Sequence, residues 1–311
     1  MIDLTDKLAP YPATRKVVEA TLAAWPEHQN YCEKRFAADK PDFLARCEHV
    51  AALALRMIGD DLREYVADYQ WMCGELLQEE FFFHRNGRYR LSTFAEADAE
   101  VYSRREYMPR YMHGLLISQI LWDPHARAFD LFQTRFLDSL PERASYLEVG
   151  PGHGFFLYFA AQQPRIARLE AWDVSASSIA ETKAALTKLG VTREAAIVQQ
   201  DILTSDARNA EFDGAVISEV LEHLERPDLA LRTLHSALRP GGKIFINAPI
   251  NSPAPDHIYL WRSPEELRAF VEAQGFEIDE TWDLPQTGVS LERARKHNLS
   301  ISCVVIARKP S

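Results

Sequence analysis

The sequence predicts an α/β fold: a mainly helical N-terminal region followed by a seven-stranded, mostly parallel sheet with an antiparallel edge. Helical periodicity dominates residues 13–140, and short β-rich runs alternate with helical stretches after Pro141. The last two β-rich runs have no clearly helical segment between them. Regular alternation of strands and helices indicates a parallel sheet covered on both faces. Because the pattern changes at Pro141, we expect two domains, residues 1–140 and 141–311.

The N-terminal region has the apolar spacing of amphipathic helices. One example runs from Phe43 to Ile58 behind Pro41, a residue type that suits the first turn of a helix. Residues 81–91, FFFHRNGRYRL, interrupt this pattern by placing Asn86-Gly87 between two short apolar or aromatic runs. Since this dipeptide favours the tight turn of a hairpin, we expect a small hairpin here.

Seven runs rich in β-branched and aromatic residues are the strand candidates. They are residues 146–150, 168–173, 195–200, 214–220, 243–249, 276–284 and 300–308. Gly190 and Gly241-Gly242 stand where helix C-caps are expected, and Ser263-Pro264 predicts a helix start. We expect the last two runs to pair antiparallel at the sheet edge, joined by a polar segment without a helix.

Composition and charge narrow the function classes. The 311 residues carry 35 basic and 45 acidic side chains, and the net charge of −10 divides into −5 before and −5 after residue 140. Neither half offers the basic surface that nucleic acid or an anionic membrane would need. No apolar run reaches the roughly 18 residues of a membrane span, and the start does not resemble a secretory signal, so we expect a cytoplasmic protein. The four cysteines lack zinc spacing and are expected to be reduced core thiols.

A glycine-rich segment follows the first predicted strand. Gly150, Gly152 and Gly154 let the chain turn sharply and let a ligand approach backbone N–H groups. Their spacing is G-x-G-x-G, which argues against the G-x-G-x-x-G of nicotinamide dehydrogenases. Asp173 ends the second strand 23 residues after Gly150, where a carboxylate can accept hydrogen bonds from ribose hydroxyls. Asp201 follows the third strand.

In this order, LEVGPGHG, Asp173, QQDIL, ISEVLEHL and LRPGGKIFINAP resemble the class I S-adenosylmethionine-dependent methyltransferases with a Rossmann-like fold, over roughly residues 143–311. The resemblance implies S-adenosyl-L-methionine as cofactor, with Asp173 on the ribose, Val174 flanking the adenine, and Asp201 with Ile202 holding the adenine. The residues implied on the methionine side and at the reaction centre are Glu148, Gly150, Gly152, His153, Ser218 and Glu219. The motif of exocyclic-amine nucleic-acid methyltransferases is missing after the fourth strand, where ISEV stands.

Candidates for the chemistry come from both regions. His223 follows the fourth strand and His257 lies in a Pro-rich loop after the fifth, so each is a candidate base, although a structural role stays open for both. Tyr259 shares that loop and is a candidate substrate contact. Residues 103–122 add a polar-aromatic stripe in which Tyr111 is a candidate catalytic group and Tyr107 and Arg110 are candidate substrate contacts. Packing roles stay open for these too, and no strong metal motif is present.

These observations predict an S-adenosylmethionine-dependent methyltransferase acting on a small-molecule metabolite, in secondary metabolism, with no nucleic-acid or membrane partner. A second hypothesis keeps the cofactor and changes the reaction: a cyclase or aminocarboxypropyl transferase that releases methylthioadenosine. A third is a non-catalytic S-adenosylmethionine-binding protein. A homodimer is compatible with the sequence, which does not decide the oligomeric state.

Overall fold

The computed structural model describes residues 4–204 and 210–311, and the chain divides into two compact units. The first, called the helical unit, comprises the chain up to Asp130 together with Ser252–Ile258 and Leu284–Ser300. The second, called the sheet unit, comprises Leu131–Asn251, Tyr259–Asp283 and Ile301–Ser311. No described helix is both long and apolar enough to cross a membrane.

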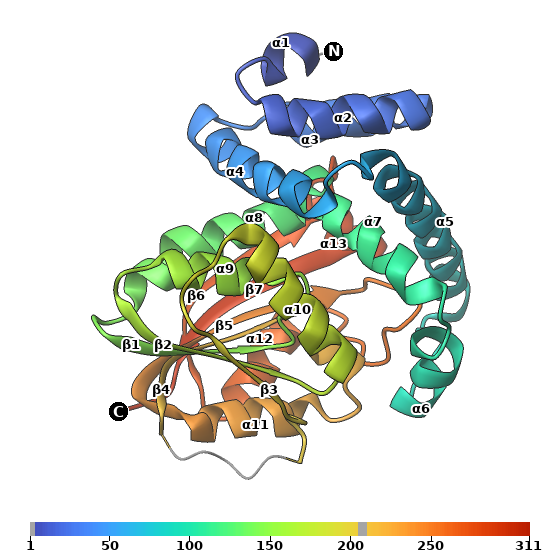
Figure 1. Cartoon of the computed structure of the whole chain (residues 1–311). Helices are drawn as coiled ribbons and strands as arrows, with labels where there is room; N and C mark the ends of the chain where they lie inside the picture. Colours follow the sequence, from blue (N-terminus) through green and yellow to red (C-terminus); the bar gives the residue numbers. More distant parts are fainter. Residues whose placement is uncertain (1–3, 205–209) are drawn as a thin grey trace. The chain divides into compact units, whose positions relative to one another are not determined.

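Helices build the first unit (Figure 1). They are α1 (Leu4–Leu8), α2 (Pro12–Ala24), η1 (Pro26–His28), α3 (Gln29–Phe36), α4 (Pro41–Ile58), α5 (Leu62–Asn86), α6 (Phe94–Ala97), η2 (Asp98–Tyr102), α7 (Tyr107–Leu121), α8 (Asp123–Leu131) and α13 (Leu291–His297). The helix predicted behind Pro41 is confirmed as α4, which buries Phe43, Cys47 and Val50 on one face. Its apolar spacing therefore reports a true core-facing stripe.

The hairpin predicted at residues 81–91 is wrong, because α5 continues through the aromatic run to Asn86. Gly87 ends the helix in the left-handed conformation, with φ +67° and its N–H donating to the Phe83 carbonyl at 2.7 Å. Phe83 faces the core of the helical unit, whereas Phe81 is exposed. Asn-Gly thus acts here as a helix stop, since both a C-cap and a hairpin turn need the positive φ that glycine provides.

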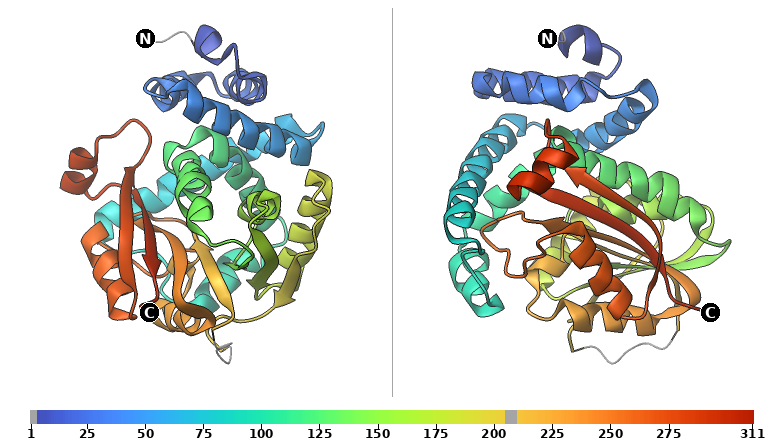
Figure 2. Two further views of the ribbon diagram at one scale, coloured as in Figure 1. Left: turned by 90° about the vertical axis from the view of Figure 1, so that its left-hand side faces the viewer. Right: turned by 180° about the vertical axis from the view of Figure 1, so that it is seen from behind.

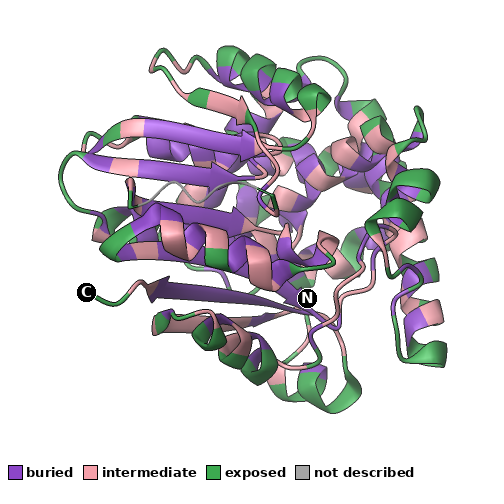
Figure 3. Cartoon of the chain, turned by 90° about the horizontal axis from the view of Figure 1, so that it is seen from below, coloured by how far each residue is buried: buried purple, intermediate pink, exposed green. Residues whose placement is uncertain are grey.

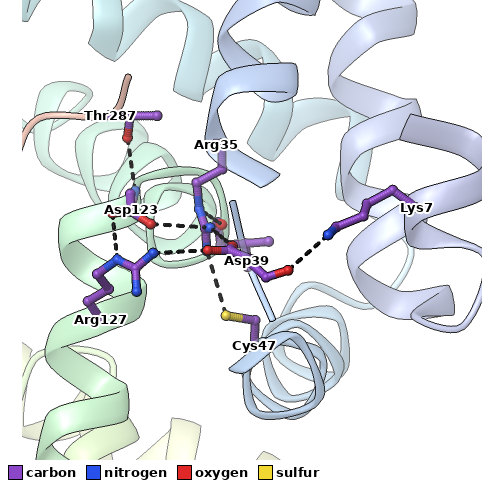
Figure 4. Close-up of polar contacts among 8 residues, drawn as sticks. Lys7, Arg35, Asp39, Cys47, Asp123, Arg127 and Thr287 are labelled. Carbon is purple, nitrogen blue, oxygen red and sulfur yellow. Dashed lines mark hydrogen bonds and ion pairs between the residues drawn. The ribbon is translucent and has the colours of Figure 1, made fainter. Parts of the chain in front are cut away.

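A buried ion network joins distant segments of the helical unit. The Arg35 side chain is fully buried and lies 2.5 Å from the Asp39 carboxylate and 3.5 Å from Asp123. Arg127 reaches both carboxylates, at 2.9 and 2.7 Å. Figure 4 shows the four side chains converging, with the Thr287 hydroxyl accepting the Asp123 backbone N–H at 2.9 Å. Two arginines and two aspartates balance in charge, as buried ions require.

The sheet unit contains the predicted seven-stranded sheet, so the fold class is confirmed. Its order is β3-β2-β1-β4-β5-β7-β6, with β7 antiparallel to β5 and the β1, β2, β3, β4 and β5 ladders parallel. The strands are β1 (Ala144–Val149), β2 (Ile166–Asp173), β3 (Ala196–Gln199), β4 (Phe212–Ser218), β5 (Leu238–Ile250), β6 (Glu277–Pro285) and β7 (Ile301–Arg308). Figure 2 shows β6 and β7 side by side at one edge.

Helices cover both faces of this sheet. Figure 1 shows α9 and α10 on one face and α11 and α12 on the other, and Figure 3 shows that the central strands are buried. The helical elements are η3 (Phe132–Phe136), η4 (Leu137–Ser139), α9 (Phe155–Gln162), α10 (Ala176–Leu189), η5 (Leu221–His223), α11 (Pro227–Ala237) and α12 (Pro264–Ala273). The predicted caps are confirmed at Gly190, with φ +76°, and at Ser263, whose hydroxyl accepts the Glu266 N–H.

Three details differ from the sequence predictions. The boundary lies at residue 130, not 140, because Phe132 and Phe136 pack on Phe245 of the sheet. Gly241-Gly242 is no helix cap: α11 ends at Ala237, and the glycines lie within β5. The polar segment before β7 contains α13, which Ser290 caps. That helix has seven residues and buries only Ala294, so it leaves no periodic signal.

Candidate functional site

The glycine-rich loop joins β1 to α9 at the carboxyl end of the sheet. Gly150, Gly152 and Gly154 all have positive φ, at +67°, +50° and +74°. A Cβ on Gly150 would stand 2.6 Å from Cγ2 of Val220, so glycine is needed for this close approach. A Cβ on Gly152 would meet nothing within 4 Å, and Thr182 of α10 holds its carbonyl at 2.8 Å. The loop therefore presents fixed backbone and open space to a ligand.

Glu148 lies on β1, two residues before the loop. Its side chain is buried and accepts a hydrogen bond from the Tyr146 hydroxyl at 2.9 Å. Burial raises the pKa of Glu148 to about 8, and the Tyr146 hydrogen bond opposes the shift. The carboxyl group can thus donate as well as accept hydrogen bonds near neutral pH. His153, inside the loop, is half-buried, and its ring is tilted against Phe155 at 6.4 Å.

Asp173 ends β2 beside the loop, because Gly150 donates its N–H to the Trp172 carbonyl at 2.9 Å. Its Oδ1 accepts the Ser175 N–H at 2.8 Å, and burial raises its pKa above the ordinary aspartate value. Val174 follows with 59% of its surface exposed, which is unusual for a valine. An acid within a hydrogen-bonded turn and an exposed apolar side chain beside it suit a sugar and a flat ring respectively.

Asp201 lies close to this turn, since the N–H of Gln200 donates to the Asp173 carbonyl at 2.8 Å. The Asp201 carboxylate accepts the Leu203 N–H at 2.8 Å, which fixes its orientation. Ile202, by contrast, is only 5% exposed. The structure therefore brings Asp201 to the same edge as Asp173 but leaves little Ile202 surface for a ligand.

Ser218 ends β4, and Glu219 follows with φ +53°. The Asn247 side-chain amide on β5 donates to Glu219 Oε1 at 2.9 Å and to the Ser218 hydroxyl at 3.2 Å. The Ser302 hydroxyl on β7 donates to Asn247 Oδ1 at 2.7 Å. Burial raises the pKa of Glu219 to about 7, against the effect of its hydrogen bonds to Ser302 and Asn247. Asn247 and Ser302 were not predicted as site residues; polar residues within apolar strands were the available signal.

His223 ends the short helix η5. Its Nε2 lies 3.6 Å from Oε1 of the buried Glu222. The Glu222 carbonyl accepts the N–H of Tyr259 at 2.9 Å, which ties the chain after β5 back to this end of β4. Tyr259 also packs on the buried Trp261, with ring centroids 4.6 Å apart. Tyr259 thus has a packing role in the sheet unit.

The remaining predicted residues belong to the helical unit. His257 is buried, with Nδ1 2.7 Å from the Ser252 carbonyl and its ring edge-on to Tyr89. Because a carbonyl only accepts, Nδ1 carries the hydrogen and Nε2 holds the lone pair when the ring is neutral. Tyr107 and Tyr111 are each 5% exposed.

Arg110 has a partner within its own unit. It donates to Asp68 of α5 at 2.8 Å and stacks over Trp71 at 4.2 Å. His113 lies 2.9 Å from the other oxygen of the same carboxylate. The side chains predicted to face a substrate here therefore contact α5, and the described contacts support the packing role that the sequence left open.

A family model described as a methyltransferase domain matches residues 123–281, just over half of the chain. No curated protein matches. Among solved structures, 1,6-didemethyltoxoflavin-N1-methyltransferase from Burkholderia thailandensis is 21% identical, with TM-score 0.51 and coverage of 71% of this chain and 92% of that one. The N-methyltransferase NodS from Bradyrhizobium japonicum WM9 is 19% identical, with TM-score 0.46 and coverage of 60% and 95%. The [4+2]-cyclase SpnF is also 19% identical, with TM-score 0.49 and coverage of 60% and 82%. At such identities the similarity concerns the fold.

Proposed function

The chain belongs to the class I S-adenosylmethionine-dependent methyltransferases, and from this premise we propose that it transfers the cofactor's methyl group to a small-molecule metabolite. The cofactor supplies a methyl group made electrophilic by the positive charge on sulfur. Transfer is an in-line displacement, so the protein has to align the acceptor with the methyl group and exclude water. Positioning and electrostatics are therefore the tasks of the residues at the carboxyl edge of the sheet.

One observation carries the proposal: the open glycine loop and Asp173 lie side by side where β1 and β2 end. In the proposed complex, Gly150 and Gly152 receive the methionine part and Asp173 accepts both ribose hydroxyls. The exposed Val174 packs against the adenine, and Asp201 accepts a hydrogen bond from its amino group. Glu148 and His153 are proposed to contact the polar methionine end of the cofactor.

Charge supports a small substrate. The chain has a net charge of −10, with −5 in each half of the sequence, so a polyanion would be repelled overall. The motif with which exocyclic-amine methyltransferases hold a flipped base is also absent after β4. Where the acceptor carries a proton to be removed, His223 is the proposed base within the sheet unit. Within the helical unit, His257 and Tyr111 are the proposed catalytic groups, whereas Tyr107 and Arg110 have packing contacts, as Tyr259 has in the sheet unit.

The nucleoside product tests the reaction. The purified protein is incubated with S-adenosylmethionine, with and without a metabolite extract, and products are identified by mass spectrometry. S-adenosylhomocysteine that forms only with extract is the expected result. Methylthioadenosine formed without extract would show that the reaction is cyclisation and not methyl transfer. If neither product forms although the cofactor binds, the chain is a binding protein.

A further inference from the structure

Glu219 lies at the point where the sheet changes direction of winding. From β1 the chain proceeds through α9 to β2 on one side, whereas β4 lies on the other side of β1. Ligands of open α/β sheets bind in the crevice at such a switch point, outside the carboxyl ends of the strands. Val220, the next residue, contacts Gly150 of the loop. Glu219 therefore borders the crevice opposite the glycine loop.

The backbone of Glu219 is held in an uncommon conformation. Its φ of +53° lies in the left-handed region, which is strained for a residue that carries a side chain. The conformation is fixed by the Glu219 N–H, which donates to the Asn247 carbonyl at 2.8 Å. The same Asn247 holds the side chain, so one residue of β5 orients both backbone and carboxylate of Glu219.

The hydrogen bonds to this carboxylate are asymmetric. Among described residues, Asn247 donates to Oε1 at 2.9 Å, and the Ser302 hydroxyl oxygen lies 3.5 Å from the same atom. Asn247 is itself held by the Ser302 hydroxyl, so its amide orientation is set by the acceptor Oδ1 facing that hydroxyl. The relay Ser302–Asn247–Glu219 spans three adjacent strands, β7, β5 and β4, and aims one carboxylate oxygen away from the relay.

No ion pair within the described ranges neutralises Glu219. The groups that face it from β5 and β7 are an amide and a hydroxyl, and the titratable groups that follow it, Glu222 and His223, lie 3.6 Å from each other. Protein surrounds the carboxylate although the residue keeps solvent access, and this burial raises its pKa to about 7. A cation bound in the crevice would lower that pKa and be attracted in return.

We propose that Glu219 is the counter-charge of the sulfonium, held by Asn247 and Ser302 as positioning residues, so that the site discriminates the cationic cofactor from its neutral product. The inference rests on the proposed function. S-adenosylmethionine and S-adenosylhomocysteine share the adenosine, carboxylate and amine and differ by the methyl group and the charge on sulfur. Ionised Glu219 therefore favours the first, and the loss of positive charge on methyl transfer favours release of the second.

Isothermal titration calorimetry with both ligands tests this without knowledge of the acceptor. If the bound sulfonium lowers the pKa of Glu219 by about one unit, the ratio of the S-adenosylhomocysteine Kd to the S-adenosylmethionine Kd should rise about tenfold between pH 5.5 and 8.5. At pH 6.5, S-adenosylmethionine binding should also release protons, seen as a dependence of heat on the buffer's ionisation enthalpy. Because this measurement uses the unaltered protein, it does not depend on any variant folding.

Variants assign the effect to the relay. Glu219→Gln should make the ratio independent of pH. Glu277→Gln, which removes an exposed carboxyl group at the start of β6, should leave the pH dependence as in the wild type. Ser302→Ala should move the midpoint of the pH dependence upward, because the ionised Glu219 carboxylate then loses part of its hydrogen-bond stabilisation. A merely structural loss would not produce this shift. Glu222→Gln should keep the pH dependence.

The outcomes separate the two proposals. If both ligands bind the wild type with a ratio that is flat across pH, the counter-charge role is overturned and the cofactor site stands. The role is likewise overturned if Glu222→Gln, and not Glu219→Gln, removes the pH dependence. If neither ligand binds, the proposed function itself fails.

Discussion

Replacement of Gly150 by alanine probes the contact between the glycine loop and the end of β4. The new Cβ would stand 2.6 Å from Cγ2 of Val220, well inside ordinary van der Waals contact. Val220 has a stiff, β-branched side chain and cannot simply swing away. The φ of +67° adds a second penalty, because alanine rarely adopts it.

The two penalties can be estimated separately. A left-handed alanine costs about 1–2 kcal/mol, and overpacking costs about 1–3 kcal/mol. Gly150→Ala should therefore lower the free energy of unfolding by about 2–5 kcal/mol. Gly152→Ala is the matched control: its φ is +50° but its Cβ would meet nothing within 4 Å, so only about 1–2 kcal/mol is expected.

Urea denaturation followed by circular dichroism measures both variants, and calorimetry measures their affinity for S-adenosylhomocysteine. The double variant Gly150→Ala/Val220→Ala should recover the overpacking part of the loss and keep the backbone part. Equal destabilisation by the two glycine substitutions, or no recovery in the double variant, would refute the reasoning.

Three further predictions concern single side chains. Asp173→Ala should weaken S-adenosylhomocysteine binding by about 1–3 kcal/mol in calorimetry, because two ribose hydrogen bonds are lost; unchanged affinity would contradict the cofactor site. Arg35→Met should lower the urea-derived unfolding free energy by about 3–5 kcal/mol, because it leaves the buried Asp39 without its closest cation; a loss under about 1 kcal/mol would contradict the network's role. Burial lowers the pKa of His28 to about 4, so the unfolded chain binds more protons between pH 6.5 and 4. Relative to His28→Phe, the wild type should thus lose about 2–3 kcal/mol of stability as pH falls through that window, and a constant difference would argue against a neutral buried ring.

Structural features that depend on residues close together in the sequence were predictable. The loop Gly150–Gly154, the acid at the end of β2 and the Ser263 cap each depend on a few neighbouring residues whose conformational needs are local. The mostly parallel pairing of the sheet followed from strand and helix alternation, whereas the strand order came from the structure. The same local logic failed at Asn86-Gly87, because a positive φ serves a helix end and a hairpin equally well.

Contacts between distant residues were decided only in three dimensions. Arg110 has the chemistry of a carboxylate receptor, yet the carboxylate it meets is Asp68, 42 residues away. The relay from Ser302 to Glu219 joins residues 83 apart, and the pKa of Glu219 depends on how closely other strands surround it. Sequence alone thus determined the fold class and the position of the glycine loop and Asp173. Tertiary structure decided which charged groups are satisfied by the chain itself and which face the crevice, because desolvation and hydrogen bonding depend on all neighbours in space.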